Sequence, residues 1–120
     1  MLRAEVFPVH ELSICNAIVS SAEKHADGRP VTQVTVRIGH LRQVVPEALQ
    51  FSWEVVSGTT DLKNAELVIE EVPAVVACRD CGARTTLDLP LLACGDCGGL
   101  DVALLSGEEL LVVSIDLVDA

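Results

Sequence analysis

The sequence predicts an α/β fold, in which a three-stranded sheet packs on two helices and carries an inserted lobe with two cysteine knuckles. Three observations predict it. Two segments place apolar residues at helical spacing, and three others have the alternation or the β-branched content of strands. Between the last two strands, residues 74–106 hold four of the five cysteines and four of the eight glycines. We therefore expect residues 9–73 and 107–120 to form one domain and residues 74–106 a second.

The first helix is predicted over residues 10–26, where apolar residues recur at intervals of three and four. The turn at residues 27–30, Asp-Gly-Arg-Pro, closes it. Cys15 lies on the apolar stripe of this helix, which favours a small buried residue over a nucleophile. The full stripe comprises Leu12, Cys15, Ile18, Val19 and Ala22.

The other elements follow in order. Residues 31–39 alternate as a strand with one buried face, and Pro46 opens a second helix that ends at Ser57-Gly58. Residues 65–72 and 109–118 supply two more strands. The apolar positions of these elements are Leu49, Trp53 and Val56 in the helix and Leu111, Val113, Ile115 and Leu117 on one face of the last strand.

Charge excludes two classes of partner. The 120 residues include 8 basic and 18 acidic ones, for a formal net charge of −10, and no Lys or Arg follows Arg84. Nucleic acid is bound largely through cations that neutralise phosphates, and anionic membranes attract basic surfaces. We therefore expect neither partner.

No apolar run approaches the roughly 18 residues that a membrane-spanning helix needs. The first residues also lack the apolar core and small-residue cleavage site of a secretory signal. We therefore expect a cytoplasmic chain, in which closely spaced cysteines are more often metal ligands than disulfide partners.

The cysteine cluster is the strongest chemical signal. Cys78, Cys81, Cys94 and Cys97 form two CxxCG knuckles separated by twelve residues. The two-residue spacer lets both sulfurs of a knuckle face one ion, and the glycine allows a tight turn with amides directed at the thiolates. Four thiolates give the closed coordination of structural zinc, so a zinc-ribbon-like lobe is predicted. Saturated sulfur ligation leaves no position for an activated water, which disfavours hydrolysis.

The cluster has three other interpretations. A thioredoxin-like redox centre requires one CxxC that opens a helix in a βαβ unit, which this pattern does not offer. A rubredoxin-like iron site uses similar ligands but usually packs against aromatic residues, and this lobe has none. Four metal-free thiols are disfavoured because a lobe of this size is too small to fold unaided.

The dipeptide His10-Glu11 lies where the first helix is predicted to begin. On its own it is typical of an ordinary polar start of a helix. His25 and His40 are interpreted as a structural residue near a helix end and a solvated loop residue. No Ser-His-Asp or Cys-His arrangement is evident, so an enzyme is not expected.

Several motifs in a specific order resemble the HypA/HybF family of hydrogenase nickel-incorporation proteins. They span about residues 9–118. The motifs are VHELSIC, VRIGHL, PEALQFSWE, AELVIEEVPA, the two CxxCG knuckles and GEELLVVSIDL.

The resemblance implies a nickel metallochaperone that delivers Ni(II) to the large subunit of a nickel-iron hydrogenase during maturation. By resemblance His10 is the imidazole ligand of nickel, and Glu11 supplies a backbone amide and an orienting carboxylate. The knuckle cysteines match the zinc ligands of the family. The implied partners are a HypB-type GTPase and the hydrogenase large-subunit precursor. Urease maturation proteins are left open as partners, as is the choice between a monomer and a homodimer.

One departure from the family concerns the N-terminus. Family members begin Met-His-Glu and use the terminal amine as a nickel ligand, whereas residues 1–8, MLRAEVFP, here precede Val9. We interpret residues 1–8 as an extension and hypothesise that translation begins at Val9, because valine codons serve as bacterial starts and are then read as methionine. If the extension is present, we expect weaker nickel affinity.

The alternative function is a zinc-ribbon adaptor or a nucleic-acid-associated module without nickel. The cysteine spacing permits it, but the absence of any basic residue after Arg84 and of aromatic residues in the lobe disfavours it.

Overall fold

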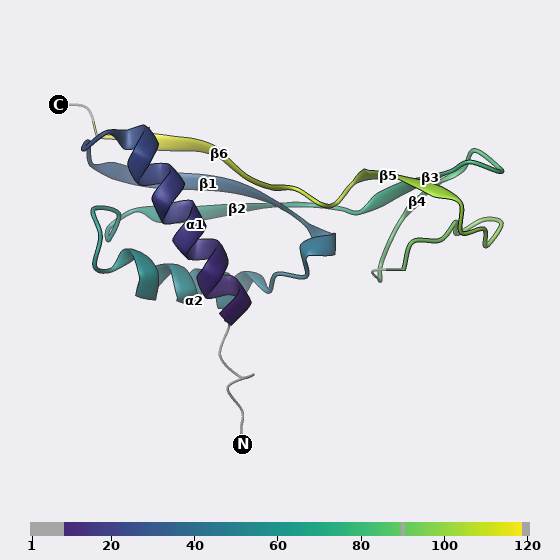
Figure 1. Ribbon diagram of the computed structural model, residues 1–120, viewed down its shortest axis with the longest axis horizontal. Helices are drawn as coiled ribbons and strands as arrows, with labels where there is room; N and C mark the ends of the chain where they lie inside the picture. Colours follow the sequence, from purple (N-terminus) through teal and green to yellow (C-terminus); the bar gives the residue numbers. More distant parts are fainter. Residues whose placement is uncertain (1–8, 90, 119–120) are drawn as a thin grey trace, which may run out of the picture. The chain divides into compact units, whose positions relative to one another are not determined.

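The computed structural model describes residues 9–89 and 91–118. The hypothesis about residues 1–8 therefore lies outside the described residues. The chain contains two longer helices, α1 (Val9–Ala26) and α2 (Pro46–Ser57), and a short 3-10 helix, η2 (His40–Arg42). Its strands are β1 (Val31–Gly39), β2 (Glu66–Val72), β3 (Val75–Cys78), β4 (Arg84–Thr86), β5 (Val102–Ser106) and β6 (Leu110–Leu117). Figure 1 shows these elements along the chain.

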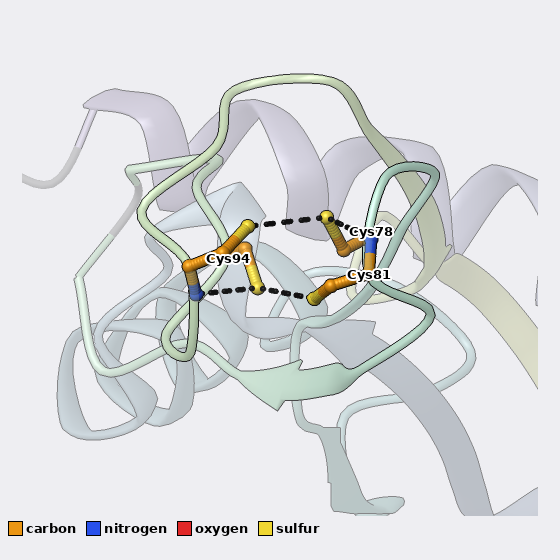
Figure 2. Close-up of side chains that lie close together, drawn as sticks. Cys78, Cys81 and Cys94 are labelled. Atoms are coloured by element: carbon orange, nitrogen blue, oxygen red, sulfur yellow. Dashed lines mark hydrogen bonds between the residues drawn. The ribbon is translucent and has the colours of Figure 1, made fainter.

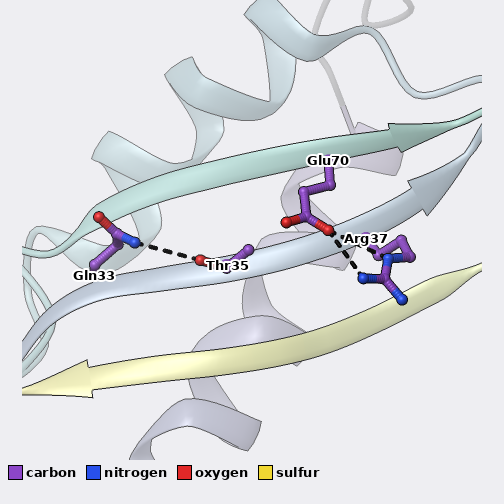
Figure 3. Close-up of polar contacts among 4 residues, drawn as sticks. All are labelled: Gln33, Thr35, Arg37 and Glu70. Atoms are coloured by element: carbon purple, nitrogen blue, oxygen red, sulfur yellow. Dashed lines mark hydrogen bonds and ion pairs between the residues drawn. The ribbon is translucent and has the colours of Figure 1, made fainter.

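Two three-stranded sheets are present, one in the order β2-β1-β6 and one in the order β4-β3-β5. In the first sheet, β2 runs in the direction of β1 and β6 runs against it (Figure 3). The predicted sequence of helix, strand, helix and two strands is confirmed, and so is the three-stranded sheet with two helices and an inserted cysteine lobe. The second sheet was not predicted, because its strands have only four, three and five residues.

The described chain divides into two compact units. The first comprises residues 9–36, 44–69 and 112–118, and the second comprises residues 37–43, 70–89 and 91–111. The boundaries between the units fall inside β1, β2 and β6. The domain limits at residues 73 and 107 stay a prediction from the sequence.

The core of the first unit lies where α1 and α2 pack together and cover one face of the sheet. Local sequence explains the ends of both helices. After α1 the chain turns through Asp27 and Gly28, both at positive φ, while Pro46 opens α2 without needing an amide partner. The buried side chains include Ile14, Cys15, Ile18, Val19, Ala22, Val34, Val36, Leu49 and Trp53.

The predicted stripes are confirmed at most positions, with two shifts. Leu12 and Val56 are only half-buried, whereas Ile14 and Ala26 are buried although they were not predicted. An α-helix turns 100° per residue, so an apolar stripe drifts across the covered face over the five turns of an 18-residue helix such as α1.

The other face of the sheet carries polar groups. Figure 3 shows Gln33 and Thr35 of β1 on the side away from the helices, where the Gln33 amide donates to the Thr35 hydroxyl at 3.4 Å. No described helix is long and apolar enough to span a membrane.

Candidate metal centre

The four knuckle cysteines converge on one point in the second unit. Their sulfur atoms all lie within 4.8 Å of one another. The Sγ atoms of Cys78 and Cys97 are 3.6 Å apart, and those of Cys81 and Cys94 are 3.5 Å apart. Figure 2 shows the sulfurs turned toward one another. These separations exceed a disulfide bond, and all four thiols are free.

Both knuckles are built by the same three backbone interactions. In the first knuckle, the amide of Cys81 donates to Cys78 Sγ at 3.4 Å. The amide of Gly82 donates to the Cys78 carbonyl at 3.0 Å, and the amide of Cys78 donates to the Ala83 carbonyl at 2.8 Å. The glycine has a φ of +79°, a conformation that other residues rarely adopt. The CxxCG pattern therefore specifies the turn as well as the ligands.

The second knuckle repeats this arrangement. The amide of Cys97 donates to Cys94 Sγ at 3.4 Å, that of Gly98 to the Cys94 carbonyl at 3.0 Å, and Cys94 donates to the Gly99 carbonyl at 2.8 Å. Gly98 has a φ of +74°. Because two equivalent knuckles face each other, they present two pairs of sulfurs to one centre.

Electrostatics make one thiol of the cluster acidic and another resistant to ionisation. The amides of Cys97 and Asp96 stabilise the Cys94 thiolate and lower its pKa to about 6. The Ala83 amide acts in the same direction on Cys81, but the sulfurs of Cys94 and Cys78 outweigh it and raise the pKa of Cys81 to about 12. Four thiolates this close repel one another, so full ionisation requires a cation between them.

The donor set fits zinc. A tetrahedral ion bound at 2.3 Å to four sulfurs places them about 3.8 Å apart, close to the separations found here. Cys78 and Cys94 are buried, whereas Cys81 and Cys97 are exposed. All four ligand positions come from protein sulfur, as in structural rather than catalytic zinc sites.

Two contacts that the sequence did not predict brace the knuckles. Arg79 lies between the first two cysteines, and its Nη1 donates to Asp101 Oδ1 at 2.8 Å and to the Val102 carbonyl at 3.1 Å. The Gly95 amide donates to Thr85 Oγ1 at 2.8 Å. Neither contact was indicated by the local sequence, because each joins residues ten or more positions apart.

His10 and Glu11 lie in the first turn of α1, in the first unit. His10 is exposed, whereas Glu11 is buried and its Oε2 accepts a hydrogen bond from the Val45 amide at 3.2 Å. Val45 caps the start of α2, so the Glu11 carboxylate joins the beginnings of both helices.

His25 and His40 do not belong to the cysteine cluster. His25 is exposed near the end of α1, with Nδ1 2.8 Å from the Ser21 carbonyl. His40 is exposed in η2, in the second unit, with Nε2 3.7 Å from Glu71 Oε1. In the described part of the chain, the four cysteines are the one group of three or more metal-ligating side chains whose donor atoms lie this close together.

Comparison with known proteins gives consistent matches. Residues 9–117 match the family described as "Hydrogenase/urease nickel incorporation, metallochaperone, hypA". The chain is 42% identical over 109 residues to the hydrogenase maturation factor HypA of Geotalea uraniireducens (strain Rf4), which covers 91% of this chain and 99% of that protein. It is 37% identical over 109 residues to the HypA of Nostoc sp. (strain PCC 7120 / SAG 25.82 / UTEX 2576), with 91% and 96% covered.

The fold is also that of solved structures. The solution structure of the Ni metallochaperone HypA from Helicobacter pylori superposes with a TM-score of 0.64 at 20% identity, covering 92% of this chain and 98% of that one. A second solution structure of a HypA protein gives the same TM-score at 22% identity.

Proposed function

We propose that this chain, which belongs to the HypA family of hydrogenase/urease nickel incorporation metallochaperones, binds Ni(II) at His10 and hands it to the large-subunit precursor of a nickel-iron hydrogenase. The observation that carries the proposal is the family match over residues 9–117, which begins at the residue before His10-Glu11. In this role the chain carries a metal and catalyses no reaction. A HypB-type GTPase is the proposed partner in nickel handling.

The imidazole of His10 is the proposed nickel ligand from a side chain. Imidazole and amide nitrogens suit the square-planar geometry that Ni(II) prefers. His10 belongs to no close cluster of ligating side chains among the described residues, so main-chain nitrogens of the first turn of α1 complete the proposed donor set. An open site of this kind favours release of the ion to a recipient.

Glu11 is proposed to act as a positioning residue. Its buried carboxylate is committed to the Val45 amide and so fixes the first turn of α1 against the start of α2. The Glu11 carboxylate also places negative charge near the proposed cation, which offsets the unfavourable helix dipole at this end.

Zn²⁺ is the proposed resident ion of Cys78, Cys81, Cys94 and Cys97. When bound, it supplies the positive charge that allows all four thiols to ionise. It also stabilises a lobe too small to fold on its own core. The role of zinc is therefore structural, and the nickel site is proposed to be separate from it in sequence and in unit.

Nickel titration by calorimetry tests the proposal, with His10→Ala as the variant and His25→Ala as its control. Both remove an exposed histidine from α1. We expect His10→Ala to weaken nickel binding by about 100-fold or more, since loss of even an orienting partner costs 10–100-fold in metal affinity.

His25→Ala should bind nickel as the unchanged chain does, and both variants should keep their zinc. Equal nickel affinity in His10→Ala and the unchanged chain would contradict the proposed site. Loss of zinc together with nickel in His10→Ala would instead make His10 a structural residue.

A further inference from the structure

Four exposed leucines lie within twelve residues of the second unit, on either side of the second knuckle in the sequence. Leu89, Leu91, Leu92 and Leu100, here called the leucine patch, have exposed fractions of 70%, 65%, 44% and 74%. Single exposed leucines are common on protein surfaces, but several within twelve residues are not scattered. Concentrated apolar exposure of this kind marks interaction surfaces.

The backbone fixes how the patch is presented. On one side, the Leu87 amide donates to the Ala74 carbonyl at 2.8 Å, next to β3. On the other side, the Cys94 amide donates to the Gly99 carbonyl at 2.8 Å, and this bond brings Leu100 beside the chain that leads from Leu92 into the knuckle. The leucines are thus tied to the zinc-binding turns at one end and to the sheet at the other.

Between these two hydrogen bonds, main-chain amides in the leucine segment donate to carbonyls of the same segment. The Leu91 amide donates to the Leu89 carbonyl at 2.7 Å, and the Ala93 amide donates to the Leu91 carbonyl at 3.0 Å. Along this hydrogen-bonded segment the side chains of Leu89, Leu91 and Leu92 are all exposed. The exposure therefore follows from the local fold and not from a frayed end.

The surroundings of the patch are acidic. Asp88 adjoins Leu89, and Asp101 adjoins Leu100; both are exposed, as is Asp96 in the second knuckle. Arg79 pairs with Asp101 at 2.8 Å, so these two charges offset each other, and Asp88 and Asp96 carry the acidic character beside the leucines. Residues 85–120 contain seven acids and no Lys or Arg, and four thiolates with one Zn²⁺ would add a net charge of about −2.

We propose that the leucine patch docks a partner protein whose contact surface presents apolar side chains surrounded by Lys and Arg. Charge decides between the candidate occupants. A second copy of this chain carries the same net charge of −10 and is repelled, as is an anionic lipid surface. A basic, apolar protein surface is complementary to both the leucines and the acids.

The test takes as its partner the hydrogenase large-subunit precursor named under the proposed function, and biolayer interferometry measures its binding to the zinc-loaded full chain. The variant is Leu89→Ser combined with Leu91→Ser. Leu105→Ser is the matched control, because Leu105 lies in the same unit, outside the patch, with an exposed fraction of 48%. We expect the double variant to bind at least about 10-fold more weakly, since truncating one central interface residue commonly costs that much. The control should stay within twofold of the unchanged chain.

Salt and charge provide the second readout. The on-rate of the unchanged chain should fall between 50 and 300 mM NaCl, and Asp88→Asn with Asp96→Asn should lower the on-rate and its salt dependence. If the double leucine variant loses zinc, Leu100→Ser replaces it and carries the same expectation.

Equal binding by the patch variant and the unchanged chain would overturn the proposal, as would an equal loss in Leu105→Ser, a salt-independent on-rate, or no binding of the precursor at all. Self-association or binding to phosphatidylglycerol vesicles that depends on the leucines would assign the patch to another occupant and also overturn it. Nickel titration of the same variants keeps the two proposals apart, because the patch variants should take up nickel unchanged.

Discussion

Cys15 is the one cysteine outside the metal cluster, and it lies fully buried between α1 and α2. Its thiol donates to the Leu49 carbonyl at 3.5 Å. Burial, assisted by the negative charge of Glu11, raises the pKa of Cys15 to about 12. The thiol is therefore neutral at physiological pH and a poor nucleophile, and its interpretation as a core residue is confirmed.

This raised pKa predicts a pH dependence of stability. The ordinary thiol pKa of 9.0 applies to the unfolded chain, so above about pH 9 the unfolded state releases a proton that the folded state keeps up to about pH 12. The contribution of Cys15 is thus complete below pH 9 and is lost as pH rises toward 12.

Urea unfolding at pH 7 and pH 10.5 measures this effect. The free energy of unfolding should fall more in the unchanged chain than in Cys15→Ala, which lacks this one buried thiol and keeps the four knuckle cysteines. The same fall in both proteins would show that Cys15 does not titrate differently in the two states.

Residue-scale prediction succeeded where a motif contains its own geometry. The convergence of the four knuckle cysteines could be predicted because each CxxCG knuckle brings two sulfurs and their amides together within five residues. The contact between Glu11 and Val45 could not, because it joins residues 34 apart that meet only after both helices have packed. Sequence reasoning treated Glu11 as a polar residue near a metal, whereas the structure buries its carboxylate.

At the scale of elements, the end of β1 lies very close to the turn between β5 and β6. The Gly39 amide donates to the Glu109 carbonyl at 2.8 Å, and the Leu41 amide to the Gly107 carbonyl at 2.9 Å. A Cβ atom on Gly39 would overlap the backbone of Gly107. Gly39 itself has an ordinary φ of −77°, so it is required for space and not for conformation.

Replacing Gly39 with Ala should therefore destabilise the protein by about 2–3 kcal/mol, the cost of overpacking against a backbone that cannot yield. Gly28→Ala is the control. Gly28 has a φ of +84° with open space around it, so this change should cost about 1 kcal/mol from conformation alone. Urea unfolding compares the two variants, and a Gly39→Ala protein as stable as the unchanged chain would contradict the close approach.

Five of the main elements were predictable because they are long enough to show a period. The predicted β1 coincides with the observed Val31–Gly39, and α2 begins and ends at the predicted residues. The strands β3, β4 and β5 were missed because three to five residues in a cysteine-rich segment show no period. Alternation in β6 indicated two faces but not which is covered, and Leu111 and Val113 remain exposed.

At the scale of the whole molecule, the two candidate metal positions fall in different units. His10 belongs to the first unit, and the four cysteines belong to the second unit. The resemblance to the HypA/HybF family is confirmed by the family match and by relatives of about 40% identity over most of the chain. Composition alone could not indicate a metal cargo, because a single histidine in a sequence carries no specific signal.

X-ray absorption at the zinc and nickel edges, measured on the chain loaded with one equivalent of each ion, tests the central claim most directly. The account predicts a zinc shell of sulfur alone at about 2.3 Å and a nickel shell of nitrogen and oxygen without sulfur. In His10→Ala the nickel shell should be lost while the zinc shell stays unchanged. Sulfur in the nickel shell, or a nickel shell unaffected by His10→Ala, would contradict the proposal that nickel binds in the first unit and zinc at the four cysteines.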